Sequence, residues 1–189
     1  MRFSTLGTWA LALLAAAAAH AGNPTSVLPM PKVLASAEIM PPFSAKDRNG
    51  EEPFQRRHLE DMVKREPGVK RVALVYFATW CGPCAAGVVR IVKMKPALKA
   101  NGVLTILVNV GEGEDNPDPV HNWVRNFGAA DFPLILDIRK QLVGPYGLSE
   151  ANGETVMPKT LVLDSKLKPL FLLGTEGDDF PEILWKLNR

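Results

Sequence analysis

Trp80-Cys81-Gly82-Pro83-Cys84 contains the only two cysteines among the 189 residues of the chain. An apolar run, residues 71–77, leads into this stretch, and a segment with helix-forming composition, residues 83–100, follows it. This order predicts a strand, a tight turn and a helix, with the two thiols at the turn. Two thiols separated by two residues in such a place favour reversible disulfide chemistry.

The position of the proline predicts different roles for the two thiols. Pro83 suits the first turn of a helix, where its missing N–H costs nothing. Cys81 then lies at the helix N-terminus, where the helix dipole and unpaired N–H groups favour a thiolate, and we expect it to be exposed. Cys84 lies one turn further in and keeps its proton. Cys81 is therefore the expected nucleophile and Cys84 the resolving thiol.

Four other interpretations of the cysteine pair are weaker. A purely structural Cys81–Cys84 disulfide closes too short a loop to stabilise the chain much. A zinc site needs about four ligands, and neither a second cysteine pair nor the spacing of His58 and His121 supplies them, so we expect no metal. Copper delivery is also disfavoured, because no nearby histidine offers a third ligand. Inert buried thiols are less expected than either a structural disulfide or a zinc site.

The N-terminus has the pattern of a secretory signal peptide, residues 1–21. Arg2 provides the positive charge, residues 6–19 are apolar, and Ala19-His20-Ala21 fits a cleavage site before Gly22. The alternative is an uncleaved membrane anchor, but the apolar run is shorter than the ~20 residues that a spanning helix needs. Export predicts an oxidising compartment, the periplasm of a bacterium.

Composition indicates one globular domain after the signal. The formal net charge is only +2, and no dense block of lysine and arginine is present, so nucleic acid is not an expected partner. Residues 22–42 contain five prolines and predict an extended lead-in or tether. Residues 43–189 are long enough for one domain with a substantial core.

Hydrophobic periodicity predicts a three-layer α/β domain, in which strands alternate with helices before a final hairpin and helix. Two short strands are expected near Phe43 and Phe54, around a turn at residues 47–50. Further strands are expected at 72–77, 103–108, 134–136, 160–163 and 170–173. Helices are expected at 58–65, 83–100, 120–127, 140–146 and 180–187. Pro96 predicts a kink or break within the helix that follows the cysteines.

Two segments resemble the thioredoxin superfamily. Residues 77–84, Phe-Ala-Thr-Trp-Cys-Gly-Pro-Cys, are similar to its active-site segment, and Ala-Thr-Trp is typical of the exported TlpA-like branch with its ResA- and CcmG-like reductases. Residues 157–164, Met-Pro-Lys-Thr-Leu-Val-Leu-Asp, resemble the segment that carries a cis-proline. The resemblance covers residues 40–189 and implies a thioredoxin-like fold, with a central mixed sheet flanked by helices.

The resemblance also implies a substrate-binding surface around the cysteines. Pro158 would be the cis-proline packed against the disulfide, and Met157 would offer backbone groups to a bound substrate strand. Trp80, Gly82 and Pro83 would form the rest of this surface. The Gly-Pro dipeptide is similar to that of the reducing members.

Two familiar carboxylates of the superfamily are missing. The position six residues before the first cysteine is Val75, and the position three residues after the second is Gly87. Neither can take the proton of Cys84. Glu112 and Glu154 lie on predicted loops and are candidate acceptors, but we expect both to be solvated; water is the other candidate.

The combined expectation is a periplasmic protein-disulfide reductase with no cofactor other than the Cys81–Cys84 disulfide. Its partners would be exported client proteins, among them those of cytochrome c maturation, and a membrane thiol donor of the DsbD kind; the membrane itself is a partner only if the signal is retained. One alternative is a disulfide oxidase or isomerase. Another is a thioredoxin-like binding module with little turnover, which would hold an apo-cytochrome, a metallochaperone client or a secretion component.

Overall fold

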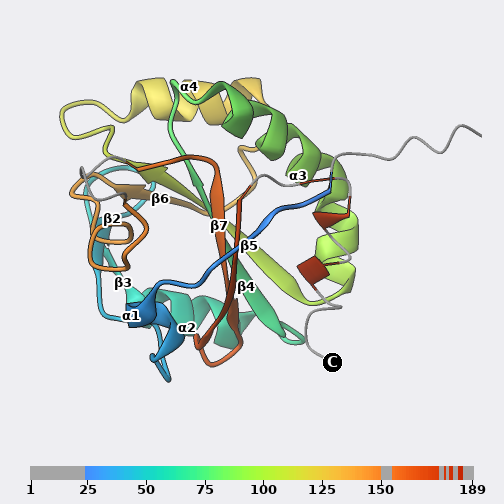
Figure 1. Ribbon diagram of the computed structural model, residues 1–189. Helices are drawn as coiled ribbons and strands as arrows, with labels where there is room; N and C mark the ends of the chain where they lie inside the picture. The colour runs from blue at the N-terminus through green and yellow to red at the C-terminus, as the bar shows by residue number, and fades with distance from the viewer. Residues whose placement is uncertain (1–23, 150–154, 175–176, 178, 181–182, 185–189) are drawn as a thin grey trace, which may run out of the picture.

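The computed structural model describes residues 24–149, 155–174, 177, 179–180 and 183–184. The predicted signal peptide lies outside them. Four helices and eight strands follow one another along the described chain (Figure 1). The elements are β1 (Val27–Leu28), α1 (Lys32–Ala35), β2 (Ser44–Lys46), β3 (Pro53–Gln55), α2 (Arg56–Arg65), β4 (Arg71–Phe77), α3 (Gly82–Ala100), β5 (Val103–Val110), α4 (Asp118–Asn126), β6 (Leu134–Asp137), β7 (Lys159–Asp164) and β8 (Pro169–Leu173).

All eight strands belong to one mixed sheet. Their order is β1-β8-β7-β4-β5-β6-β2-β3. The pairs β4–β5 and β5–β6 are parallel, and the other neighbouring pairs are antiparallel. The sheet confirms the expected strands, including the hairpin of β2 and β3 and the closing pair of β7 and β8.

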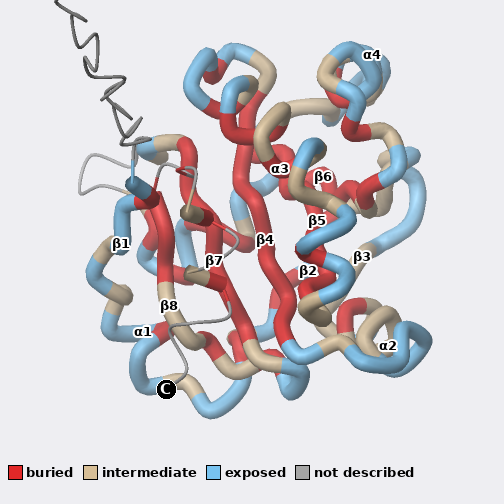
Figure 2. Tube along the Cα trace, turned by 90° about the vertical axis from the view of Figure 1, so that its right-hand side faces the viewer, coloured by how far each residue is buried: buried red, intermediate tan, exposed pale blue. Residues whose placement is uncertain are grey.

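Strand β4 lies in the middle of the sheet and leads directly to the cysteines. All seven of its residues are buried, and Figure 2 shows it as a continuous buried strand between its neighbours. A strand covered on both faces has no need of alternating polar residues. This explains why residues 71–77 form an unbroken apolar run after Arg71.

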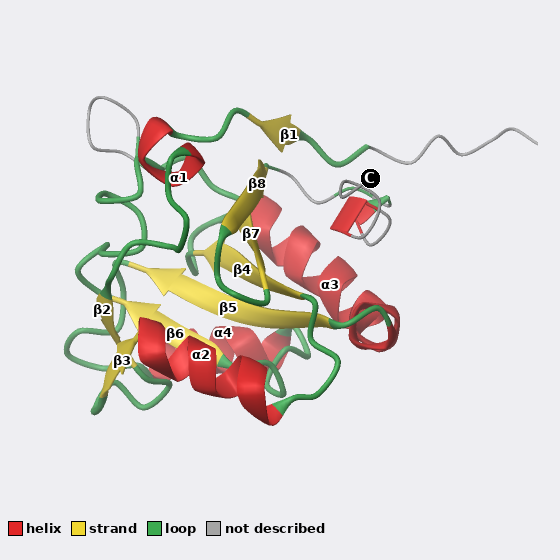
Figure 3. Cartoon of the chain, turned by 90° about the horizontal axis from the view of Figure 1, so that it is seen from below, coloured by secondary structure: helices red, strands yellow, loops and turns green. Residues whose placement is uncertain are grey.

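Helices cover both faces of the sheet. Leu34 of α1 and Leu59 of α2 belong to the core on one face, together with Leu74 of β4. Val88 of α3 and Val124 of α4 belong to the core on the other face. Seen from below, α2 lies on the near side of the sheet and α4 on the far side (Figure 3). The expected three-layer architecture is confirmed.

The expectation that residues 22–42 form an extended tether is wrong for the described part of this segment. Strand β1 pairs with β8, with Val27 opposite Leu173. Leu34 and Met40 are completely buried. The prolines keep the regular elements short, but the apolar residues between them still reach the core.

Two further local expectations, a helix at 140–146 and a break at Pro96, are wrong. Residues 141–147 form successive turns and not a helix, since Gly144 and Pro145 interrupt them and the hydrogen bonds span three, four and five residues. Helix α3 continues through Pro96 to Ala100 without a break. Leu98 beyond the proline is buried in the core, and this packing holds the last turn in place.

The expected terminal helix, residues 180–187, falls mostly outside the described residues. Phe180 and Leu184 are fully buried against the same core as α3. Within the described parts of the chain, no helix combines the length and the apolar character needed to cross a membrane.

Candidate active site

The two cysteines lie at the N-terminus of α3, directly after the central strand. Cys81 is the residue that caps the helix, and its backbone N–H donates to the carbonyl of Ala78 at 3.0 Å. Pro83 lies in the first turn, as predicted. The backbone N–H of Cys84 points at Sγ of Cys81 at 3.2 Å. The helix start therefore directs an N–H group at the sulfur that was expected to be the nucleophile.

Cys81 and Cys84 form a disulfide, with 5.3 Å between their Cα atoms. The exposed fractions are 4% for Cys81 and 2% for Cys84. Cys84 is buried, as expected, but the expectation that Cys81 is exposed is wrong for this oxidised form. Both sulfurs belong to the apolar core between β4 and α3, because α3 packs its first turn onto the sheet.

The Met157–Pro158 peptide bond is cis, which confirms the conformation expected of Pro158. Lys159, the next residue, begins β7 and pairs with Tyr76 of β4. Pro158 therefore lies beside the end of β4, where the chain turns toward Cys81. Met157 packs against the core that contains both cysteines. The topology thus brings together two segments that are more than 70 residues apart in sequence.

A hollow of about 490 Å³ lies next to this meeting point. Trp80 and Met157, both expected at the substrate surface, line it, and 71% of Trp80 is exposed. The remaining lining residues are Val110, Gly111, Lys140, Thr155 and Val156. Gly82 and Pro83 are exposed at the start of α3 but do not line the hollow. The hollow is therefore formed mainly by loops and not by the helix.

The family of the chain follows from comparison with known proteins. The AhpC/TSA family matches residues 37–168. This chain belongs to the AhpC/TSA family. The AhpC/TSA chain is 32% identical over 109 residues to the thiol-disulfide oxidoreductase ResA of Bacillus subtilis (strain 168). The match covers 58% of this chain and 54% of ResA, so the chain spans about half the length of the curated relatives it matches.

Solved structures show the same fold at lower identity. A thiol:disulfide interchange protein of the thioredoxin family from Chlorobium tepidum TLS has a TM-score of 0.57 and 22% identity over 77% of this AhpC/TSA chain and 92% of its own. StoA from Bacillus subtilis has a TM-score of 0.53 and 18% identity over 81% of this chain and 100% of its own. The expected thioredoxin-like fold is confirmed.

Glu112 lies at the cysteine loop, a position that the sequence did not predict. It is half-buried, and its carboxylate accepts hydrogen bonds from the backbone N–H and the hydroxyl of Thr79, two residues before Cys81. The side-chain amide of Asn109 donates to it as well. The expectation that Glu112 is solvated is wrong, because the turn after β5 directs it at the cysteine loop. Glu154 lies outside the described residues.

The two missing carboxylates leave apolar surroundings at the disulfide. Val75 and Gly87 are both buried next to the cysteines. The hydrogen bonds of the described residues connect Glu112 with Thr79 and Asn109 and not with Cys84. No described group of histidine, cysteine and acidic residues has the arrangement of a metal site.

A largely buried carboxyl with a raised pKa belongs to Asp137, the last residue of β6. Burial raises the pKa of its carboxyl to about 6, although backbone N–H groups of Leu142 and Gln141 donate to it and oppose the rise. Tyr76 and Tyr146 lie close to it, and burial raises the pKa of both phenols. Tyr76 and Tyr146 belong to the core opposite the disulfide, so this cluster is separate from the redox site.

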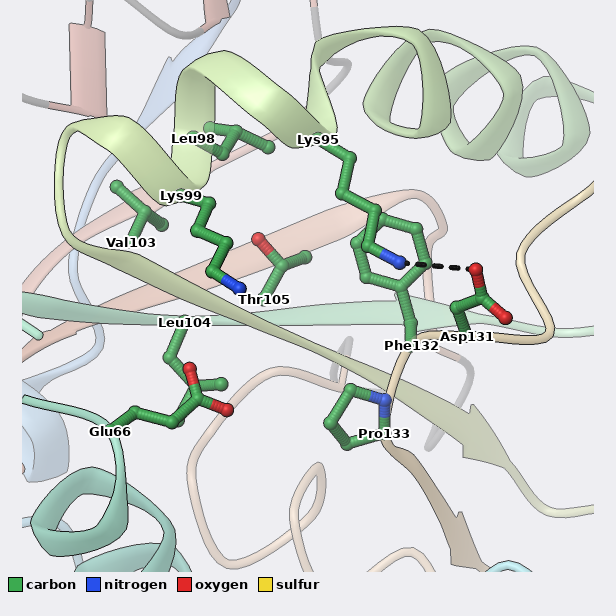
Figure 4. Close-up of a pocket in the computed structure, with 10 residues that line it drawn as sticks. All are labelled: Glu66, Lys95, Leu98, Lys99, Val103, Leu104, Thr105, Asp131, Phe132 and Pro133. Carbon is green, nitrogen blue, oxygen red and sulfur yellow. Dashed lines mark hydrogen bonds and ion pairs between the residues drawn. The ribbon is translucent and has the colours of Figure 1, made fainter.

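A second cavity, of about 220 Å³, lies at the other end of the sheet (Figure 4). It is bounded by the last turns of α3 and the beginning of β5. The ammonium of Lys95 pairs with Asp131 at 3.4 Å and lies over the ring of Phe132. Because the cysteines occupy the first turn of α3, this cavity is remote from them and takes no part in the redox site.

Proposed function

We propose that this chain is an exported thiol–disulfide oxidoreductase that reduces disulfides in client proteins with the Cys81/Cys84 pair. One observation carries the proposal: the disulfide at the N-terminus of α3 lies in the core against which Met157, of the cis Met157–Pro158 bond, packs. The name of the Bacillus subtilis relative, thiol-disulfide oxidoreductase ResA, supports it. The pair itself is the redox group, and we propose no further cofactor.

The reduced form would act in two steps. The Cys81 thiolate attacks one sulfur of a client disulfide; an S–S bond forms between protein and client, and the other client sulfur leaves as a thiolate. Cys84 then loses its proton and attacks Sγ of Cys81, which releases the second client thiol. The client gains two electrons and two protons, and the protein ends with the Cys81–Cys84 disulfide.

The surroundings suit this chemistry. The helix N-terminus and the N–H of Cys84 stabilise negative charge on Sγ of Cys81. The exposed Trp80 and the hollow beside Met157 offer an apolar surface to an extended client segment. We expect backbone groups at Met157 to pair with such a segment, since Met157 lies before Lys159, the first residue of β7 that pairs with β4.

The reduced pair must be regenerated after each cycle. In an oxidising compartment this requires an external source of two electrons, for which we propose a membrane thiol donor of the DsbD kind. The signal-like N-terminus supports export to the periplasm. Sequencing the N-terminus of protein recovered from the periplasm tests export: a start near Gly22 supports it, and an intact Met1 in the cytoplasm contradicts it.

A trapping experiment tests the activity and identifies the client. The Cys84→Ser variant cannot resolve the mixed disulfide, so covalent adducts through Cys81 should accumulate and disappear on treatment with a thiol. The Cys81→Ser/Cys84→Ser double variant is the matched control and should trap nothing. Absence of adducts from the single variant would instead support a binding module with little turnover.

The direction of electron flow needs a separate measurement. Equilibration with glutathione should give a reduction potential near that of thioredoxin, about −270 mV. A value near that of DsbA, about −120 mV, would contradict the reductase assignment and favour an oxidase.

A further inference from the structure

The loop between β4 and α3 is held by a single carboxylate. Residues 78–80 connect the central strand to Cys81 and contain no regular structure. The backbone N–H of Thr79 donates to Oε2 of Glu112 at 2.8 Å, and the Thr79 hydroxyl donates to Oε1. The Glu112 side chain, just after β5, therefore accepts hydrogen bonds from both donors of Thr79.

Glu112 is itself fixed in place from behind. Asn109 is fully buried in β5 opposite Phe77 of β4, and its side-chain amide donates to Oε2 of Glu112 at 2.6 Å. Gly111 between them has a φ of 75°, which turns the chain back toward the neighbouring strand. The ends of two parallel strands are thus joined by a network of three charge-assisted hydrogen bonds.

The same carboxylate places a negative charge at Thr79, two residues before the nucleophile. Thr79 and Cys81 are two residues apart, a stretch of chain that spans at most ~7 Å. Reduction of the disulfide creates a thiolate at Cys81, whereas the disulfide carries no charge. A carboxylate nearby raises the free energy of the thiolate form, so the pair loses electrons more readily.

We propose, on the basis of the function proposed above, that Glu112 is a positioning residue that sets the redox poise of the cysteine pair. Its hydrogen bonds fix the loop ahead of Cys81, and its charge opposes the helix dipole and keeps the pair strongly reducing. Val75 and Gly87 carry no carboxylate that could influence the reduction potential of the cysteine pair. Glu112 would supply that charge, without taking the proton of Cys84.

Other charged residues near this loop allow the direction of the proposed electrostatic effect to be tested. Glu114 is exposed on the same loop, and among the described residues its side chain makes no hydrogen bond or ion pair. Lys140 lies beside Gly111: its Cε is 3.0 Å from the position that a Cβ on Gly111 would occupy. The positive charge of Lys140 should partly offset the negative charge of Glu112.

The experiment compares Glu112→Gln with Glu114→Gln in the full chain, by equilibration of the disulfide with glutathione. Loss of the charge at 112 should shift the equilibrium about threefold to tenfold toward the reduced pair. The midpoint pH of alkylation at Cys81 should fall by about half a unit to one unit. Glu114→Gln should match the wild type in both measurements, and Lys140→Gln should shift both in the opposite direction.

A wild-type equilibrium and midpoint in Glu112→Gln would overturn the proposal. If that variant folds poorly, Glu112→Asp is the alternative, because it keeps the charge but shortens the reach to Thr79. A near-wild-type reduction potential in Glu112→Asp supports the charge role. A potential shifted as far as predicted for Glu112→Gln contradicts it. Both readouts concern the protein's own disulfide. They remain distinct from failure of the proposed function, which would show as a wild-type protein unable to reduce any client disulfide.

Discussion

The ammonium of Lys159 donates a hydrogen bond to the backbone carbonyl of Val156 at 2.8 Å. It donates a second to the carbonyl of Leu148 at 3.1 Å. Lys159 directly follows the cis-proline and is buried, whereas Val156 lines the hollow beside Trp80. The buried ammonium of Lys159 thus links the start of β7, just after Pro158, to Val156 on the exposed edge just before it.

Replacing Lys159 with methionine should loosen this edge. Methionine has a similar length but no donor, so two carbonyls lose their partner, at a cost of about 1–3 kcal/mol in the free energy of unfolding. We expect KM for a client disulfide to rise while the glutathione equilibrium of the disulfide stays at the wild-type value. Lys166→Met, at an exposed position, is the control for urea unfolding and for client kinetics. A wild-type KM in Lys159→Met would contradict this role.

Trp80 should contribute to client binding but little to stability, because most of its side chain is exposed. Trp80→Ala is expected to weaken affinity for a trapped client by about 2 kcal/mol, roughly thirtyfold. The free energy of unfolding should change by about 0.5 kcal/mol or less. Reduction of a small disulfide such as oxidised glutathione serves as the control and should change far less. Equal losses for both substrates would place Trp80 in the chemistry and not in client recognition.

Asp137 should make the stability of the protein depend on pH. Its pKa is about 6 in the folded chain and about 4 when unfolded, so the folded state binds its proton more tightly. Its contribution is present in full below pH ~4 and is lost as pH rises through ~6, a change of about 3 kcal/mol. Urea unfolding between pH 4 and 7 measures it. Asp137→Asn should lack this fall, while Asp115→Asn, an exposed control, should retain it.

Gly102 should not tolerate a side chain. Its φ is 74°, and a Cβ there would lie 2.4 Å from the carbonyl oxygen of Gly68. Gly102→Ala is therefore expected to lower the free energy of unfolding by about 2 kcal/mol. Gly144→Ala is the matched control, since a Cβ there meets nothing closer than 3.6 Å. Equal melting temperatures for the two variants would show that the turn after α3 can adjust.

The elements around the cysteines could be predicted because local sequence determines them. The apolar run of β4 and the proline in the first turn of α3 each carry their own signal, and both were located to within a residue or two. The cis-proline followed from the family resemblance alone, since a proline before a strand is most often trans.

The features that escaped prediction depend on long-range contacts. Leu34 and Met40 are isolated apolar residues among prolines, and only the assembled core shows that they are buried. Glu112 lies in a loop of polar residues, and its role arises because β5 ends beside β4. The register of two parallel strands, and not any motif, brings its carboxylate to Thr79.

The short strands at the two rims of the sheet have a consequence for a protein that would handle unfolded clients. Among the described residues, the sheet ends in β1, of two residues, and in β3, of three residues beginning with Pro53. Rims this short offer little template for an aggregating chain. An extended client would instead find its unpaired backbone partners beside Met157, where the sulfurs are. Under the proposed function, clients would then dock away from the rims at which β-sheet growth could begin.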